Sequence, residues 1–172
     1  NTGRRQRQMC IRDRSDSKWK GRIAIRSSGN MYNQSLVSSL IANHGEATIE
    51  AWAKDFVGNF ARKPEGNDRA QIMAVANGEA DIAIANSYYI GLMLSGKKGE
   101  EQQAAARKVQ LHFPGQDGRG AHINVSGAGL MKNAPNKSNA VKFIEFLLGE
   151  EAQAHIVNCL LYTSDAADDQ CC

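Results

Sequence analysis

Two short apolar segments limit what this chain can fold into more than any other feature of its sequence. The first is Ile-Ala-Ile at residues 23–25, between two arginines, and the second is Ile-Ala-Ile-Ala at 82–85, between Asp81 and Asn86. Short apolar runs with polar flanks are typical of strands, and the second has the character of a strand buried in a parallel sheet. Segments with helical spacing lie between and after them, so the chain is predicted to form an α/β sheet with helices on both faces.

The spacing of apolar residues predicts the other elements. Two further segments, 109–113 and 122–126, have strand-like sequences. Helices are expected at residues 36–41, 49–57, 72–76, 90–94, 100–108, 140–147 and 150–157. Asn-His-Gly at 43–45 and Asn-Gly at 77–78 are expected to end two of these helices.

The two ends of the chain differ from its body in composition. All four cysteines lie near the ends, so the body has no thiolates for a disulfide framework or a metal site. Residues 1–15 carry five arginines, and residues 159–172 carry three aspartates and no basic residue. The segments 9–14 and 160–169 resemble translated adapter DNA, so we expect both tails to be non-native or disordered.

Charge, hydropathy and motifs exclude several classes of protein. The formal net charge is +3, but without the two tails the body has 16 basic and 14 acidic residues and is close to neutral, so nucleic acid is not expected as a partner. No run approaches the ~20 apolar residues of a membrane-spanning helix. Ser126 lies in no nucleophile elbow, and the glycine-rich turn at Asp117 lacks the ending of a phosphate loop. His112 and His122 have a spacing that fits no zinc pattern, and we assign them no ligand role.

Tyrosines gather in the loops where a ligand site is expected. Three of the four tyrosines, Tyr32, Tyr88 and Tyr89, follow the ends of the two apolar strands, and ligands of α/β sheets bind beyond the carboxyl ends of strands. Neighbouring side chains diverge on a strand or a helix. Tyr88 and Tyr89 can therefore reach one ligand only where the chain turns from strand into helix, a place that also favours anions.

The tyrosine cluster can be interpreted as a metal site, or as packing or a wall for an organic ligand. A phenol is neutral at pH 7 and becomes a strong oxygen donor when a highly charged cation replaces its proton. Hard oxygen donors select hard ions, so tyrosines without cysteine favour Fe(III) over zinc or copper. Three phenolates would neutralise Fe(III) and leave positions for a neutral ligand, an imidazole or a small anion near Arg26 and residues 28–30. The alternative is ordinary packing, or an aromatic wall for an organic molecule.

Five segments carry a resemblance to a known family. They are Trp-Lys-Gly-Arg-Ile at 19–23, Ser-Gly-Asn-Met-Tyr-Asn-Gln-Ser-Leu at 28–36, Asp-Ile-Ala-Ile-Ala-Asn-Ser-Tyr-Tyr at 81–89, Phe-Pro-Gly-Gln-Asp-Gly-Arg-Gly at 113–120 and His-Ile-Asn-Val-Ser-Gly-Ala-Gly at 122–129. Together they resemble the ferric-iron-binding periplasmic solute-binding proteins of bacterial ABC importers. The paired tyrosines after a short apolar strand, combined with Tyr-Asn-Gln-Ser, are the specific part of this match.

The resemblance implies roles for individual residues. Tyr88 and Tyr89 would be two ferric ligands, and Tyr32 would be the third. Arg26, Ser28 and Asn30 fall where some relatives hold a synergistic anion such as carbonate. The implied function is uptake of Fe(III) without catalysis, by a periplasmic and monomeric protein that delivers its cargo to an ABC permease in the inner membrane.

The resemblance also implies a domain organisation. The expected fold is a periplasmic-binding-protein-like lobe of type II, with a mostly parallel sheet flanked by helices. Family members are longer and close two lobes on the metal, so we expect a C-terminal fragment with the first lobe largely missing. Residues 16–130 would form the ligand-binding lobe, and residues 131–158 would form C-terminal helices that pack on the missing lobe. Residues 1–15 and 159–172 would be the tails.

A second function from a different class stays open at this point. The chain could be an α/β enzyme or sensor domain that binds a small organic ligand or an anion, with the tyrosines as a stacking wall. Coordination of Fe(III) by phenolates gives a visible charge-transfer colour, whereas stacking on an organic molecule does not.

Overall fold

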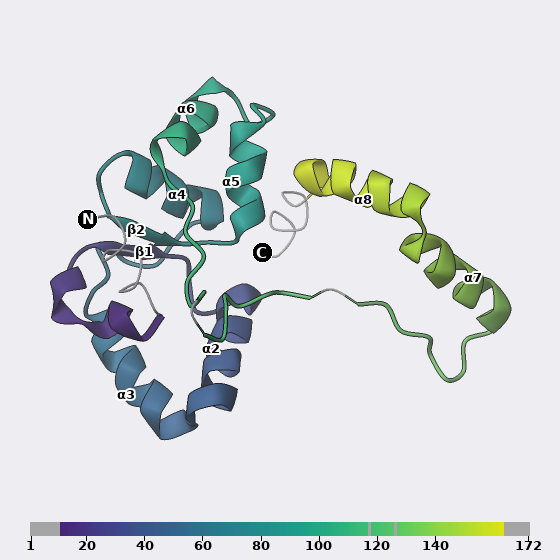
Figure 1. Cartoon of the computed structure of the whole chain (residues 1–172), viewed down its shortest axis with the longest axis horizontal. Coiled ribbons are helices and arrows are strands. Elements are labelled where there is room, and N and C mark those ends of the chain that lie inside the picture. The colour runs from purple at the N-terminus through teal and green to yellow at the C-terminus, as the bar shows by residue number, and fades with distance from the viewer. Residues whose placement is uncertain (1–10, 117, 126, 164–172) are drawn as a thin grey trace. The chain divides into compact units, whose positions relative to one another are not determined.

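The protein consists of two compact units, each described here by itself. The computed structural model describes residues 11–116, 118–125 and 127–163, and for residues 11–12 and 157–163 it describes the backbone alone. The first unit extends to Asn124 and contains both strands, and the second begins at Val125 and contains the last two helices (Figure 1).

The two apolar segments form one parallel sheet, as predicted. Strand β1 (Ile23–Ile25) pairs with β2 (Ile82–Ile84), with Ile23 opposite Ile82 and Ile25 opposite Ile84. Phe60 adds a single parallel bridge to Ile23. Because the strands are parallel and in register, the residues that follow β1 and β2 emerge side by side at the same edge of the sheet.

Helices α2 (Met31–His44) and α3 (Glu46–Val57) cover one face of this sheet (Figure 1). Leu40 of α2 is fully buried, and Trp52 and Phe56 of α3 stack with ring centroids 4.5 Å apart. Residues four positions apart lie on the same side of a helix, which explains why both rings reach the sheet. The resulting core contains Ile23, Ile25, Leu40, Ile49, Trp52, Phe56 and Ile82.

Helices α4 (Asp68–Ala76), α5 (Ser87–Leu94) and α6 (Glu100–Lys108) cover the opposite face (Figure 1). Ala24 of β1 and Ala74 of α4 are buried against each other, and such small side chains let a helix lie close to a strand. A second core joins these three helices, formed by Ile72, Tyr89, Ile90, Met93, Ala105 and Ala106. The predicted arrangement of helices on both faces is confirmed.

Polar caps and glycines set the ends of the helices between the strands. Asn30 caps α2, because its Oδ1 accepts a hydrogen bond from the Tyr32 N–H at 3.0 Å. Asn67 caps α4 in the same way through the Ala70 N–H at 3.1 Å. The expected stops are confirmed as well, since Gly45 and Gly78 follow the two helices with φ of +82° and +78°.

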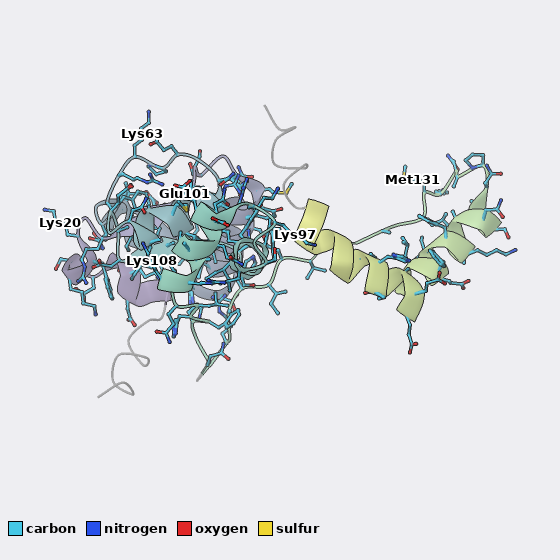
Figure 2. All side chains as sticks on the ribbon, turned by 90° about the horizontal axis from the view of Figure 1, so that it is seen from above. Lys20, Lys63, Lys97, Glu101, Lys108 and Met131 are labelled. Atoms are coloured by element: carbon cyan, nitrogen blue, oxygen red, sulfur yellow. The ribbon has the colours of Figure 1, made fainter. Side chains whose placement is uncertain are left out.

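The second unit is a pair of helices, α7 (Lys137–Leu148) and α8 (Glu150–Thr163), that contact each other. Ala152 is buried, but Phe143 and Leu148 of α7 are 60% and 74% exposed. Met131, on the connection that precedes α7, is also exposed and projects from the chain in Figure 2. In the part of the chain that the structure describes, no helix combines the length and apolar character needed to cross a membrane.

Two predicted strands do not form. Residues 109–113 and 122–125 have irregular backbone, and neither segment pairs with another strand within the described residues; Ser126 lies outside them. Leu111 and Phe113 are 46% and 49% exposed, so the first segment lacks the burial that makes strand propensity effective. In the second segment, polar side chains bond to the neighbouring loops and helices, as described below.

The structure describes the part of each tail that lies nearest the body. Residues 11–15 form a 3-10 helix, η1 (Ile11–Ser15), followed by η2 (Ser17–Trp19). Arg14 is 7% exposed, and its carbonyl oxygen accepts a hydrogen bond from the Asn59 side chain at 2.7 Å. Helix α8 continues through residues 159–163. Residues 1–10 and 164–172 lie outside the described residues, so the origin of the tails stays a prediction.

The core under α2 leads to a stability prediction. Replacing Leu40 with Ala removes a fully buried side chain between α2 and the sheet, and we expect the free energy of unfolding to fall by about 2 to 5 kcal/mol. Urea denaturation of the chain measures this loss. The matched control is Leu94→Ala, because Leu94 is 43% exposed and should lose much less; equal losses at both positions would contradict this core.

Candidate metal centre

The parallel sheet brings the tyrosine-bearing turns to one place. Tyr32 is the second residue of α2, which follows β1 through a short turn. Tyr88 and Tyr89 are the second and third residues of α5, which follows β2. Since β1 and β2 are hydrogen-bonded neighbours, both helices begin beyond the same edge of the sheet, where ligands of α/β sheets bind.

Tyr88 interacts with both of the other tyrosines. The rings of Tyr88 and Tyr89 lie with centroids 4.3 Å apart at an angle of 35°. The Tyr88 phenol forms side-chain hydrogen bonds with both Tyr32 and Tyr89. Tyr89 is completely buried, whereas Tyr32 and Tyr88 are half-buried. The cluster is therefore a group of adjacent phenol oxygens supported by one buried ring.

This environment keeps Tyr88 protonated. Burial raises the pKa of the Tyr88 phenol far above its ordinary value, and the hydrogen bonds with Tyr32 and Tyr89 raise the pKa further. Both effects favour the neutral form over the phenolate. A ligand that needs the phenolate must therefore supply enough charge to displace the proton, and a trivalent cation meets that requirement better than a divalent one.

A buried ion pair lies beside the cluster. Arg26 follows β1 directly, and its Nη1 lies 2.5 Å from Oδ2 of Asp68, the first residue of α4. The Arg26 and Asp68 side chains are 13% and 2% exposed. The Arg26 guanidinium carbon also lies 5.9 Å from the centre of the Tyr32 ring. The positive charge next to Tyr32 is thus already matched by a carboxylate of the chain itself.

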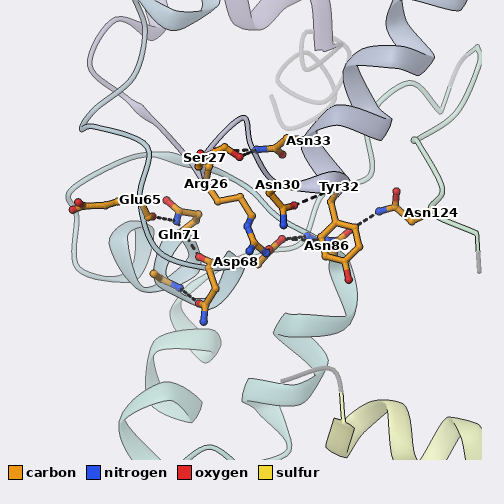
Figure 3. Close-up of polar contacts among 12 residues, drawn as sticks. Arg26, Ser27, Asn30, Tyr32, Asn33, Glu65, Asp68, Gln71, Asn86 and Asn124 are labelled. Carbon is orange, nitrogen blue, oxygen red and sulfur yellow. Dashed lines mark hydrogen bonds and ion pairs between the residues drawn. The ribbon is translucent and has the colours of Figure 1, made fainter. Parts of the chain in front are cut away.

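The same carboxylate reaches the second tyrosine-bearing turn (Figure 3). Oδ1 of Asp68 accepts hydrogen bonds from the backbone N–H and the side-chain amide of Asn86, at 2.7 Å and 3.3 Å. Asn86 directly precedes α5, and its Oδ1 accepts a hydrogen bond from Asn124 at 2.8 Å. Nε2 of His122 lies 3.0 Å from the Ser35 hydroxyl of α2. The segment that failed to form a strand is thus tied to both tyrosine-bearing elements.

The predicted anion-binding residues are only partly brought together. Arg26 is occupied by Asp68, so an added anion would share the guanidinium with that carboxylate. The Asn30 Oδ1 caps α2 and is engaged by the Tyr32 N–H. Ser28 is exposed on the turn after β1. Their role toward an anion stays a prediction.

Other metal-ligand types do not gather in the described part of the chain. No group of three His, Cys, Asp or Glu side chains there could hold a metal ion. A cavity of about 320 Å³ lies along β2 and is lined by His112 together with Asp81 and Lys108. The tyrosines do not line this cavity, and it adds nothing to the cluster.

The sequence reasoning missed three residues that surround the tyrosines. They are Asp68, Asn86 and Asn124, to which the sequence patterns assign no role in the site. The position of Asn86 in the sequence could have indicated its role. Asn86 lies just after β2 and Arg26 lies just after β1, and parallel pairing brings the residues that follow two neighbouring strands close together. Nothing in the sequence indicates that Asp68, from a helix outside both turns, contacts both of them.

Sequence similarity to known proteins covers most of this chain. Residues 19–154 match the model of the bacterial extracellular solute-binding protein family. The chain is 58% identical over 142 residues to iron uptake protein A1 of Synechocystis sp., which covers 83% of this chain and 39% of that protein. It is 32% identical over 136 residues to the major ferric iron-binding protein of Neisseria meningitidis, covering 79% and 39%.

Solved structures share the fold. Trichodesmium FutA (IdiA), in complex with iron and citrate ligands, matches with a TM-score of 0.80 and 56% identity over 84% of this chain and 46% of that one. The ferric binding protein from Campylobacter jejuni matches with a TM-score of 0.80 and 38% identity over 87% and 47%. These likenesses confirm the predicted type II periplasmic-binding-protein-like fold. The chain spans less than half the length of each of these four proteins.

The protonated tyrosine cluster predicts a loss of stability at alkaline pH. Because the pKa of Tyr88 is raised on folding, its contribution is fully present below the ordinary tyrosine pKa of about 10 and is lost progressively as the pH rises above it. The free energy of unfolding, measured by urea denaturation at increasing pH, should fall more steeply for the unmodified chain than for Tyr88→Phe. Tyr162→Phe serves as the control and should retain the steep fall; identical slopes for all three chains would contradict the prediction.

Proposed function

The chain belongs to the bacterial extracellular solute-binding proteins, and we propose on that basis that it binds Fe(III) through Tyr32, Tyr88 and Tyr89 for iron uptake. The named relatives include an iron uptake protein and a major ferric iron-binding protein. Their names support the cargo, and the tyrosine cluster supports the ligands. Since the chain spans only part of these relatives, the cargo and partners of the whole protein are part of the proposal.

The contact of three phenols at the edge of the sheet carries this proposal. Tyr88 is hydrogen-bonded with Tyr32 and Tyr89, so three oxygen donors lie within reach of one ion. Phenolate is a hard donor and a known ligand of ferric haem iron. Three phenolates together carry the charge that neutralises Fe(III), which offsets the cost of placing a trivalent ion beside a buried ring.

The Asp68 carboxylate affects whether the proposed Fe(III) site needs an additional anion. Asp68 neutralises Arg26 without any external group. An anion such as carbonate would complete the coordination from the side of Arg26 and Asn30 only by sharing hydrogen bonds that the chain already uses. The proposed cargo is therefore Fe(III) held mainly by phenolates, with carbonate or citrate as an accessory ligand.

Uptake requires release as well as binding. Protons compete with the metal for each phenolate, and the raised pKa of Tyr88 makes this competition strong. A fall in pH, reduction of the iron, or separation of the ligands that enclose it would all release the cargo. We propose that the whole protein acts in the periplasm as a monomer, performs no catalysis and passes Fe(III) to an ABC permease in the inner membrane.

Phenolate coordination predicts a visible colour. The full-length protein that carries this chain should develop a charge-transfer band on addition of ferric citrate. Tyr88→Phe and Tyr89→Phe should each weaken that band and lower the affinity for Fe(III), measured by competition with citrate. Each loss should exceed the ~10- to 100-fold that removal of an outer-sphere partner typically costs.

The control variant is Tyr162→Phe, which changes the fourth tyrosine of the chain and should leave band and affinity unchanged. A colourless protein that binds a small organic molecule instead, with binding lost on Tyr88→Ala and kept on Tyr88→Phe, would reject iron transport. That pattern would support the aromatic-wall alternative.

A further inference from the structure

We propose that Asp68 is a positioning residue for the iron site, because its buried carboxylate holds the two tyrosine-bearing turns at a fixed spacing. This inference rests on the proposed function. It adds to the site a residue that is neither a tyrosine nor part of either turn. Asp68 belongs to α4, whereas Tyr32 begins α2 and Tyr88 and Tyr89 begin α5.

The two oxygens of Asp68 divide between the two turns. Oδ2 lies 2.5 Å from Nη1 of Arg26, in the turn after β1. Oδ1 accepts from the backbone N–H of Asn86 at 2.7 Å and from its side chain at 3.3 Å, in the turn after β2. One rigid carboxyl group therefore spans the distance between the two turns (Figure 3).

Each of the two residues that contact Asp68 is linked in turn to a helix that carries a tyrosine of the cluster. On one side, the Arg26 guanidinium carbon lies 5.9 Å from the Tyr32 ring, and the Arg26 carbonyl accepts a hydrogen bond from Asn33 of α2 at 2.8 Å. On the other side, Asn86 is the residue that precedes α5, so fixing its N–H fixes the first turn that carries Tyr88. A displacement of either turn would change the separation of the phenol oxygens.

Asp68 itself is held firmly. Its side chain is 2% exposed, and it occupies the first position of α4, where negative charge interacts favourably with the helix dipole. Ala74 of the same helix is buried against Ala24 of β1. The carboxylate is thus anchored to the sheet from which both turns emerge, and it has enough donors around it to remain charged when buried.

The test is Asp68→Asn in the full-length protein. The amide has one oxygen, and when this oxygen accepts from the Asn86 N–H the NH2 group faces Arg26, so the link to the Tyr32 turn is lost while the link to α5 survives. We expect a ~10- to 100-fold loss of Fe(III) affinity in citrate competition. We also expect the charge-transfer band of the iron-loaded variant to change in the same direction as that of Tyr32→Phe.

The chain offers a matched control at the opposite end of the same strands. Arg22 precedes β1, and it forms an ion pair and a hydrogen bond with Asp81, which precedes β2. Asp81→Asn makes the same chemical change to an aspartate–arginine pair between the same two strands, but away from the tyrosines. It should leave the affinity and the band unchanged.

A second variant keeps the test decisive if Asp68→Asn does not fold. The double variant Arg26→Met/Asp68→Leu removes both charges of the buried pair together, so neither of these two is left without the other. It should melt close to the unmodified protein yet show the same loss of iron affinity.

The outcomes separate the two proposals. If the unmodified protein gives no charge-transfer band, the proposed function fails, and the positioning role fails with it. If the unmodified protein binds iron but Asp68→Asn or the double variant retains its affinity and band, with at most a lower melting temperature, Asp68 is an ordinary structural residue and the inference is overturned. Equal effects of Asp68→Asn and Asp81→Asn would overturn it as well.

Discussion

Parallel pairing of β1 with β2 is the constraint on which the rest of this protein depends. Two neighbouring parallel strands require a long crossover, here formed by α2, α3 and α4, and they end at the same edge of the sheet. Each strand is only three residues long, so isoleucine and alanine side chains on its two faces must supply most of its stability. The in-register pairing of Ile25 with Ile84 then places the two following turns side by side.

Buried polar groups determine the charge state of the tyrosine cluster at this edge of the sheet. Burial and the hydrogen bonds with Tyr32 and Tyr89 raise the pKa of the Tyr88 phenol, so this side chain favours its neutral form. Arg26 would add a positive charge that repels a metal ion, but Asp68 cancels it within the protein. The raised pKa of Tyr88 and the neutralised Arg26 together favour a cation whose charge is high enough to displace the phenol proton.

Sequence reasoning predicted the fold well where the signal is local. The apolar runs at 23–25 and 82–84, the stops after α2 and α4, and the family follow from residue patterns within short windows. It failed for 109–113 and 122–125, because a strand needs a partner and burial that a short pattern does not reveal. It predicted no element for residues 11–15, where the Arg14 carbonyl accepts a hydrogen bond from Asn59, 45 positions away.

The site was predictable to a similar degree and for the same reason. Tyr32, Tyr88 and Tyr89 lie next to strands, so topology alone brings their turns together. Asp68 and Asn124 reach these turns through contacts between residues far apart in the chain, and no spacing rule connects them. Their positions depend on how α4 and the segment before Asn124 pack, which is a property of the folded core.

The contacts around the candidate site join residues that are far apart in the chain, and this affects when the site can form during folding. Arg26 and Asp68 are 42 positions apart, and Asn124 lies 38 positions beyond Asn86. Closing such loops is entropically costly and tends to occur late in folding. Residues 23–57 contain Tyr32 but neither Asp68 nor the other two tyrosines of the cluster. The candidate site therefore forms only after α4 and α5 have packed on the sheet.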